Sequence, residues 1–360
     1  MKQQWIFDNN AFLRLCDLVN TISPSMNENA MGCRLRSIWS DVCCDVKTDV
    51  MGNVHATLES GNVFNLGIIA HMDSVAVQIT NILPNGQLQM RHIGLRPHTL
   101  LGQSMKVLTK EGVIEGVVGF DPTSQYGQPK GLIDEDLWMD IGASDYDQAC
   151  KMVEPGDLAV LTPRITEMGD GNICGAALDD RIGLFIMNEC FSWFARHSVP
   201  VNLHFIGTVQ EEVGLRGAGV IAANTPLDAC IVLDVDYATD TPASHINQMG
   251  SLKLGKGVGL HIKSDNNPVL RGICKEVAER EHIPYQLSLG RFIYGGTDGS
   301  SIQIQQSGIA VANLNIPCRY MHSPVEMCNK YDVESAVRLL IAVITEIAEK
   351  ELYTFIPGVD

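Results

Sequence analysis

The sequence predicts an α/β fold that is interrupted by a small all-β insert. Helical and strand-like stretches alternate through most of the 360 residues, and apolar residues make up 45% of the chain, as in ordinary globular α/β proteins. Between residues 75 and 165 this texture gives way to short strands separated by Gly and Pro turns. We therefore expect one domain built from residues 1–74 and 166–360, with residues 75–165 inserted as a separate β module.

The first part of the α/β domain reads as helix, turn and helix over the first forty residues, followed by strands within residues 46–58. The run NVFNLGIIAHMDS at residues 62–74 is nearly continuously apolar, which predicts a central strand. His71 and Asp73 then lie at its C-terminal end.

The insert is predicted by its turns. Residues 79–94 alternate around Asn85-Gly86, a strong hairpin signal. Short strands are expected in residues 106–119, 137–143 and 154–163.

After the insert, the α/β pattern resumes. Residues 179–197 have helical periodicity, and three strands follow within residues 201–209, 229–237 and 309–317. Residues 333–353 close the chain as an amphipathic helix.

The charge of the chain argues against anionic partners. It carries 26 Lys and Arg against 42 Asp and Glu, a formal net charge of -16. Nucleic-acid binding depends on neutralising phosphates with basic side chains, so we expect no nucleic-acid partner and no membrane partner. The N-terminus lacks the apolar core of a signal peptide. Eleven cysteines, an odd number without a CxxC pair, fit reduced thiols, so we expect a cytoplasmic protein.

Candidate functional residues gather where predicted strands end, which is where an open α/β sheet places its chemistry. Each group alone is weak, because single histidines and paired carboxylates are usually structural or solvated. Together, two imidazoles and several carboxylates suit a pair of zinc, cobalt or manganese ions and predict a hydrolase that activates water. The groups are His71-Met72-Asp73, Asp179-Asp180, Glu211-Glu212, Asp234 and His322.

The spacing within two of these groups suggests separate roles. Asp73, two residues after His71 on the same face of a strand, is placed to fix the orientation of a metal-binding imidazole. Glu211 and Glu212 point in different directions, so one can bind a metal while the other acts as general base. The charge of the metal would offset their repulsion.

Six segments carry a family resemblance: AHMDS, AALDDRIG, TVQEEVGLRGA, VLDVDYATDTP, GGTDGSS and IPCRYMHSPVE. In this order and spacing they closely resemble the tetrahedral (TET) or glutamyl-aminopeptidase-like family of co-catalytic dinuclear zinc metallopeptidases. The resemblance covers almost the whole chain. It implies a mixed central sheet sandwiched by helices, the zinc-aminopeptidase-like arrangement, and a PDZ-like insert used for dimerisation.

The resemblance also implies an activity and an assembly. The protein would be a metal-dependent aminopeptidase that removes N-terminal residues from short peptides. It would form a homo-oligomer, with dimers that can build a tetrahedral dodecamer. Two divalent ions per subunit are implied, Zn²⁺ first, with Co²⁺ or Mn²⁺ as alternatives.

Five metal ligands follow from the resemblance. His71 and Asp234 would hold one ion, Glu212 and His322 would hold the other, and Asp179 would be shared between them.

The remaining site residues are assigned in the same way. Glu211 would be the general base that takes a proton from the attacking water and passes it to the leaving amine, and Asp73 would orient His71. The spacing of the family's motif favours Asp234 over Asp236 as the ligand. Asp298, in the GGTDGSS turn, would have a supporting role.

Some alternatives stay open at this level. The chain departs from the family pattern at Ser74–Ala76, Asp180 and Tyr237, which bears on substrate preference and metal affinity more than on hydrolysis. Arg291 and Arg319 could each bind a substrate or form a structural ion pair. The same metals would also serve an amidohydrolase or deacylase of small N-acyl substrates. Relatives have been labelled endoglucanases, but the histidines favour metal chemistry over glycoside hydrolysis. A catalytically silent assembly protein would be expected to lack a ligand or the base, and none is missing.

Overall fold

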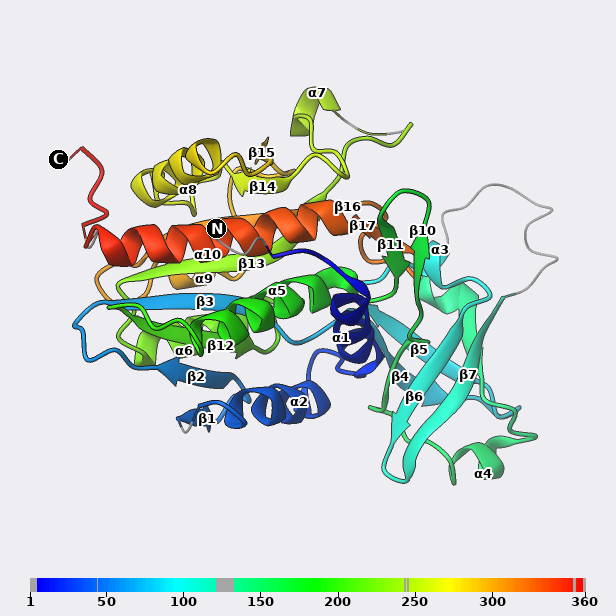
Figure 1. The fold of residues 1–360 in the computed structure, drawn as a ribbon. Helices are drawn as coiled ribbons and strands as arrows, with labels where there is room; N and C mark the ends of the chain where they lie inside the picture. The colour runs from blue at the N-terminus through cyan, green and yellow to red at the C-terminus, as the bar shows by residue number, and fades with distance from the viewer. Residues whose placement is uncertain are drawn as a thin grey trace.

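A mixed eight-stranded sheet forms the centre of the molecule (Figure 1). The computed structural model describes residues 5–43, 45–120, 133–242, 244, 246–351 and 354–358. The four middle strands are parallel, and β2 and β14 run antiparallel to their inner neighbours. In spatial order the strands are β1 (Val46–Thr48), β2 (Val54–Leu58), β12 (Asn202–Thr208), β3 (Asn65–His71), β13 (Ala229–Tyr237), β16 (Ala310–Cys318), β14 (Val258–His261) and β15 (Tyr285–Ser288).

Helices cover both faces of this sheet. Leu66 and Ile68 of β3 belong to one buried cluster and Ile69 to another, and successive strand residues point to opposite faces. The larger cluster packs against α1 (Asn9–Asn20), α2 (Asn29–Ser40), α5 (Leu178–Phe194), α8 (Pro268–Arg280) and α10 (Lys330–Glu349). The smaller cluster packs against α6 (Arg216–Asn224) and α9 (Gly299–Ile302). The predicted helical sandwich around a mixed sheet is thus confirmed.

Local sequence fixes where several helices begin. The Asp8 side chain accepts a hydrogen bond from the Ala11 N–H and caps α1. Asn267 caps α8 in the same way, with Pro268 in the first turn, where its missing N–H costs nothing. Asn329 caps α10 by accepting from the Tyr331 N–H.

The expected β insert contains a closed six-stranded barrel with its own buried core. Its hairpin turn at Asn85-Gly86 needs the glycine, because φ of Gly86 is +83° and a Cβ there would meet the Asp145 carbonyl at 2.8 Å. Residues 121–132 of the expected insert lie outside the described residues. Around the barrel the strands are β4 (Ala76–Ile82), β5 (Leu88–Ile93), β8 (Leu137–Asp140), β7 (Gly112–Phe120), β6 (Ser104–Thr109) and β9 (Leu158–Leu161).

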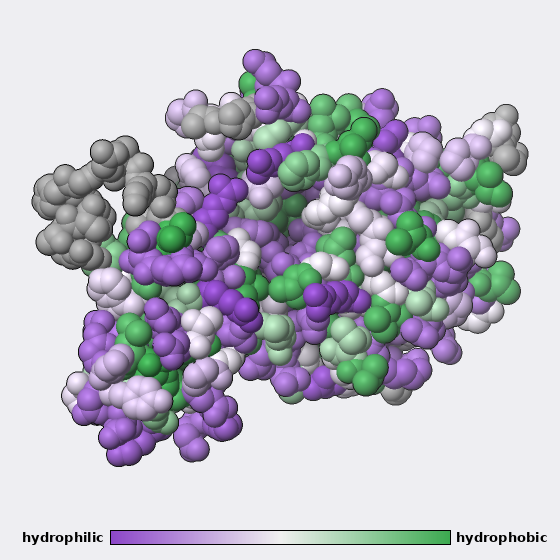
Figure 2. Space-filling view, turned by 180° about the vertical axis from the view of Figure 1, so that it is seen from behind, coloured by the Kyte–Doolittle hydropathy of each residue, from purple (hydrophilic) through white to green (hydrophobic). Residues whose placement is uncertain are grey.

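Short elements complete the fold. A three-stranded sheet that the sequence did not predict joins β10 (Ile165–Met168), β11 (Asn172–Gly175) and β17 (Glu326–Asn329). Single turns of helix occur at Pro97–Leu100, Asp134–Asp136, Tyr146–Ala149 and Ile246–Met249. Figure 2 shows the rear face, where the barrel projects at the lower left and hydrophilic side chains predominate on it. Within the described ranges, no helix is both long and apolar enough to cross a bilayer.

Candidate metal centre

The carboxyl ends of the parallel strands meet at one edge of the central sheet. His71 is the last residue of β3 and pairs with Thr208, the last residue of β12. Glu211 and Glu212 follow Thr208 in the next turn. Val232 of β13 pairs with Ile69, so continuing this register by two residues brings Asp234 level with His71. β13 spans Ala229–Tyr237, as the sequence predicted, so Asp234 lies within the strand, three residues before its last residue.

Asp179 lies between two histidines. Its Oδ1 is 3.0 Å from His71 Nε2, and its Oδ2 is 3.3 Å from His322 Nε2. Asp179 stands at the start of α5 and not at a strand end, and its backbone there is not yet helical. Burial alone would raise the pKa of Asp179, but the bonds to the two imidazoles hold it below its ordinary value.

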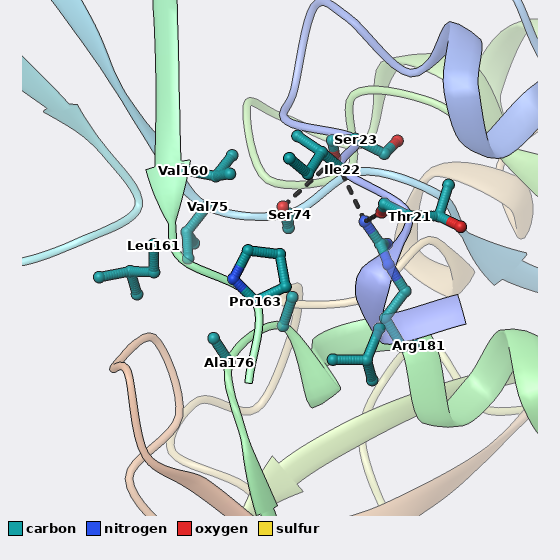
Figure 3. Close-up of a pocket in the computed structure, with 12 residues that line it drawn as sticks. Thr21, Ile22, Ser23, Ser74, Val75, Val160, Leu161, Pro163, Ala176 and Arg181 are labelled. Carbon is teal, nitrogen blue, oxygen red and sulfur yellow. Dashed lines mark hydrogen bonds between the residues drawn. The ribbon is translucent and has the colours of Figure 1, made fainter. Parts of the chain in front are cut away.

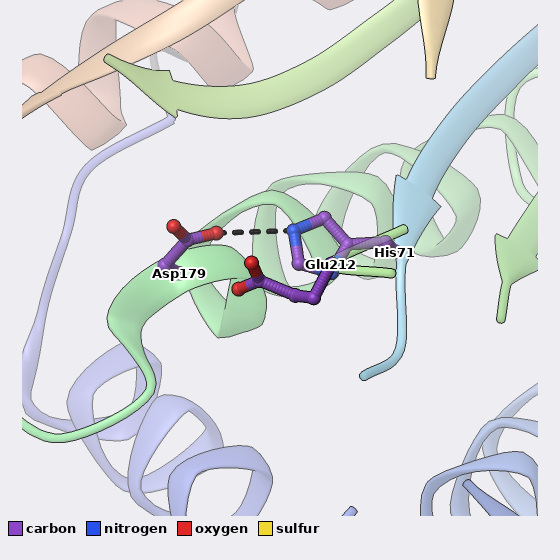
Figure 4. A group of neighbouring side chains, drawn as sticks. All are labelled: His71, Asp179 and Glu212. Atoms are coloured by element: carbon purple, nitrogen blue, oxygen red, sulfur yellow. Dashed lines mark hydrogen bonds and ion pairs between the residues drawn. The ribbon is translucent and has the colours of Figure 1, made fainter. Parts of the chain in front are cut away.

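Glu212 joins the same group of ligand-type atoms. Its Oε2 is 3.2 Å from His322 Nε2, whereas its Oε1 is buried without a hydrogen-bond partner among the described residues. His71, Asp179 and Glu212 each offer one atom, and these atoms lie within 4.8 Å of one another (Figure 4). A buried, unpartnered carboxylate oxygen at this point is the kind of atom that a cation satisfies.

Asp73 connects His71 to the turn that carries both glutamates. Its two carboxylate oxygens accept the backbone N–H groups of Glu211 at 3.0 Å and Glu212 at 3.2 Å. His71 Nδ1 lies 3.1 Å from the Asp73 carbonyl oxygen and 3.4 Å from its carboxylate. Asp73 therefore lies next to His71, as predicted, and it also holds the glutamate turn, which the sequence did not reveal.

The site concentrates negative charge out of water. Burial raises the pKa of Glu211 and of Asp234 well above their ordinary values, and neighbouring carboxylates raise both further. Burial and the charge of Asp179 also raise the pKa of Glu212. Buried like charges of this kind favour the binding of a positive ion.

Glu326 is a site residue that the sequence prediction did not assign. It is fully buried, and its carboxylate accepts the backbone N–H of Asp179 at 3.1 Å and that of His322 at 2.8 Å. Burial and the charge of Asp179 raise the pKa of Glu326 to about 8. Its presence in the IPCRYMHSPVE segment, four residues after His322, was the available signal.

The barrel also touches the site. His322 Nδ1 lies 3.0 Å from the carbonyl oxygen of Gly94, which follows β5. This contact orients the imidazole so that its Nε2 faces Asp179 and Glu212.

Arg181 is a buried cation next to the residues that follow β3, and Figure 3 shows it among the residues that line a small pocket. Its Nη1 donates to the Met72 carbonyl at 2.8 Å, and its Nη2 lies 3.4 Å from the Ser23 carbonyl. It lines a cavity of 20 Å³ with Ser74 and Thr21, room for about one water molecule. Burial lowers the pKa of Arg181 to about 10, which still leaves it charged at neutral pH.

Contacts distinguish between the two roles that the sequence left open for Arg319. Arg319 forms a two-bond ion pair with Asp240, at 2.7 and 2.6 Å, which favours the structural reading. The Arg291 guanidinium lies 5.3 Å from the Phe292 ring centre.

Two other acids of the site region each accept a hydroxyl group through one carboxylate oxygen, whereas Asp298 Oδ1 and Asp180 Oδ2 are buried without a partner among the described residues. Asp298 accepts a hydrogen bond from the Thr208 hydroxyl, beside His71. Asp236 accepts from the Ser288 hydroxyl, which leaves Asp234 as the better candidate ligand of the two.

Comparisons with known proteins identify the family of the chain. Residues 52–339 match the model of the M42 glutamyl aminopeptidase family. The lysyl aminopeptidase of Pyrococcus furiosus is 34% identical over 318 residues, covering 86% of this chain and 89% of the relative.

Solved structures are similar over nearly the full chain. The aminopeptidase APDkam598 from the archaeon Desulfurococcus kamchatkensis has a TM-score of 0.90 at 30% identity, covering 97% of this chain and 98% of that one. The TET1 peptidase of Pyrococcus horikoshii, which can assemble into a tetrahedron or a large octahedral shell, has a TM-score of 0.83 at 28% identity, with 92% and 98% covered. The chain therefore belongs to the M42 glutamyl aminopeptidase family and is a metal-dependent aminopeptidase, a hydrolase of peptides.

Proposed function

We propose that this aminopeptidase uses two divalent ions to remove N-terminal residues from short peptides. The observation that carries the proposal is the position of Asp179, whose two oxygens face the Nε2 atoms of two different histidines. A carboxylate that shares its oxygens in this way is the usual bridge between two ions.

The donor set supports this assignment. His71 and Asp234 would hold one ion, Glu212 and His322 the other, and Asp179 both. Imidazole and carboxylate together suit Zn²⁺, with Co²⁺ and Mn²⁺ as alternatives. Such ions would give the unpartnered Glu212 Oε1 a partner. They would also favour the ionised form of the buried acids, whose pKa values are raised in their absence.

The chain's own residues would carry the proton transfers. When bound, the ions supply an acidified water and a polarised scissile carbonyl. Glu211 would accept the proton of the attacking water and give it to the leaving amine nitrogen. Asp73 would keep Glu211 in place by accepting its backbone N–H. Asp298 would support the C-terminal end of β12 by accepting the Thr208 hydroxyl.

The wider organisation is part of the proposal. We assign residues 1–74 and 166–360 to the catalytic domain and residues 75–165 to a PDZ-like module that mediates dimerisation. The shells formed by the Pyrococcus horikoshii TET1 peptidase support a homo-oligomer, with a tetrahedral dodecamer as the assembly to test. We place the protein in the cytoplasm, with short peptides as substrates.

Digestion of a mixed peptide library tests the activity. Free and N-acetylated peptides are incubated with metal-loaded enzyme, and products are read by mass spectrometry. Stepwise loss of residues from free N-termini alone is expected, and Glu211→Gln should slow it by roughly 10²–10⁴-fold. Glu59→Gln, at an exposed position, is the matched control and should keep full activity. Release of acyl groups without trimming would instead favour a deacylase of N-acyl substrates.

Metal analysis tests the ligands separately. Wild-type protein should retain two equivalents of metal after dialysis, and Asp179→Asn should lose both ions because it contacts both. Asp41→Asn, exposed and remote in sequence from the ligands, should retain them. Retention of both ions by Asp179→Asn would refute the shared-carboxylate assignment.

A further inference from the structure

Two cysteines face each other at the base of the hairpin that carries His322. Arg319 and Met327 exchange both backbone hydrogen bonds, each at 2.9 Å. The next pair outward in this antiparallel register is Cys318 with Cys328, and it falls in the non-hydrogen-bonded position. Such pairs have Cα atoms about 4.5 Å apart, at the short end of the range of about 4.4–6.8 Å that a disulfide spans.

The two thiols are neighbours in this register. Both side chains are buried, and each affects the pKa of the other through a side-chain hydrogen bond, while Cys318 Sγ also donates to the Arg319 carbonyl oxygen at 3.4 Å. Cys174 is the other cysteine nearby, but β11 pairs it with Met327, whereas Ile173 is the partner of Cys328. Side chains alternate along a strand, so Cys174 points away from the face that Cys328 shares with Cys318.

The segment between these cysteines contains working parts of the site. His322 contacts Asp179 and Glu212, and Glu326 holds the backbones of Asp179 and His322. The hairpin is exposed at Tyr320 and Val325, which are 49% and 50% exposed. A bond across its base would shorten the distance between the two sulfurs and shift the strands that position His322.

We propose that Cys318 and Cys328 form a reversible disulfide that is closed by small hydroperoxides and that changes the position of the His322 hairpin. The effect on activity rests on the proposed role of His322, whereas formation of the bond does not.

The chemistry balances with the hydroperoxide as oxidant. With hydrogen peroxide, one cysteine attacks as thiolate, the S–O bond of a sulfenic acid forms and the O–O bond breaks; the leaving hydroxide takes up the proton that the thiol released and departs as water. The second thiol then attacks the sulfenic sulfur. The S–S bond forms, a second water leaves, and two thiols have been oxidised while one hydrogen peroxide has been reduced.

Burial sets the expected rate. Both cysteines are at most 1% exposed, so the reaction should be slow in the closed protein and should follow opening of the exposed hairpin. Exposed Cys33 and Cys150 should react with peroxide sooner, but Cys33 lies in α2 and Cys150 follows the helical turn Tyr146–Ala149, so neither belongs to a strand pair with an opposing cysteine.

Peptide mapping provides a direct test. Reduced enzyme is treated with hydrogen peroxide, free thiols are alkylated, and the protein is digested with trypsin. Cleavage after Arg291, Arg319 and Lys330 places Cys318 and Cys328 in separate peptides with no other cysteine, residues 292–319 and 320–330. A disulfide therefore joins two peptides that are otherwise separate.

We expect the joined peptides in wild-type protein, disappearing with dithiothreitol. Activity should fall in proportion to the fraction of molecules that carry the disulfide, by several-fold when most molecules carry it. It should recover on reduction. Cys328→Ala and Cys318→Ala should resist this loss, and Cys328→Ser offers a second substitution should the alanine variant fold poorly. Cys33→Ser and Cys150→Ser are matched controls that should behave like wild type.

Three outcomes would overturn the proposal. The first is absence of joined peptides at peroxide doses that oxidise Cys33. The second is equal inactivation of Cys328→Ala, and the third is joined protein with unchanged activity. Failure of the proposed function would give a different result from failure of the disulfide proposal. Reduced wild-type enzyme would then be inactive on peptides, while peptide mapping would still detect the disulfide.

Discussion

The carboxylate of Asp73 accepts the backbone N–H of Glu211 at 3.0 Å and so ties the end of β3 to the turn that holds the glutamates. The neighbouring N–H of Glu212 binds the other oxygen of the same carboxylate. The position of the two glutamates therefore depends on a residue whose sequence spacing indicated only a role beside His71.

Replacing Asp73 by asparagine tests this connection. The amide has one acceptor oxygen and one NH₂ group, so one of the two backbone N–H groups would face a donor. We expect kcat to fall about 10–100-fold, the usual effect of removing a residue that orients metal-site groups. Asp332→Asn is the control, since Asp332 is also buried and accepts two backbone N–H groups, from Gly255 and Gly257. Asp332→Asn should lower the free energy of unfolding but leave kcat unchanged. An unchanged kcat in Asp73→Asn would contradict the proposed role of Asp73.

Glu326 makes the matching connection on the other side of the site. Its two oxygens hold the backbones of Asp179 and His322. In Glu326→Gln only one of these bonds can persist, so the two proposed ligands should become less well aligned. We expect metal affinity to fall about 10–100-fold, measured by competition with a chelator. Glu349→Gln, exposed near the end of α10, should bind metal like wild type. Equal affinities in the two variants would show that Glu326 does not position the ligands.

The sequence predicted the elements whose pattern is local. β3 and β13 are long apolar runs because both of their faces are buried. The β4–β5 hairpin is recognisable from Asn85-Gly86, because few residues adopt that turn. His71 ends its strand as expected, since the apolar run stops there.

Features that depend on packing were not readable in this way. The four-residue strands β10, β11 and β17 carry too short a pattern to be distinguished from loops. Glu326 and Arg181 are charged residues that are buried only because distant segments close over them, and charge alone predicts exposure. The contact of Gly94 with His322 joins residues 228 positions apart, which no local pattern reports.

Arg319 provides a test between structural and substrate-binding roles. Its two bonds to Asp240 hold the loop after β13 against the end of β16, and the two side chains are partly buried, at 25% and 14% exposed. Arg319→Gln should lower the free energy of unfolding by about 1–2 kcal/mol and leave KM for peptides unchanged. Urea denaturation and steady-state kinetics measure the two effects. Arg291→Gln, on an exposed loop, should leave stability unchanged. A raised KM without loss of stability in Arg319→Gln would show that the guanidinium binds substrate.

A histidine pair away from the proposed ligands gives the protein a pH-dependent stability. His55 Nε2 lies 2.9 Å from His204 Nδ1, and His204 Nε2 lies 3.0 Å from Asn65 Oδ1. If His204 donates from Nε2 to Asn65, its Nδ1 accepts from His55, and this arrangement requires a neutral His204 ring. The pKa of each histidine is lowered to about 4, chiefly by burial, and for His204 the charge of the neighbouring His55 is part of the cause.

The sign follows from the unfolded chain, where histidine titrates near its ordinary pKa of about 6.5. Above pH 6.5 both rings are neutral in both states and their contribution to stability is complete. As the pH falls from 6.5 to 4, the unfolded chain takes up protons before the folded protein does. The free energy of unfolding is therefore lower by about 3 kcal/mol per ring at pH 4. His204→Gln should flatten this part of the unfolding free energy against pH, measured by urea denaturation, whereas His98→Gln at an exposed position should not. If the unfolding free energy of His204→Gln fell as steeply between pH 6.5 and 4 as that of wild type, other groups, chiefly carboxylates, would cause the fall. The histidine pair would then not be its origin.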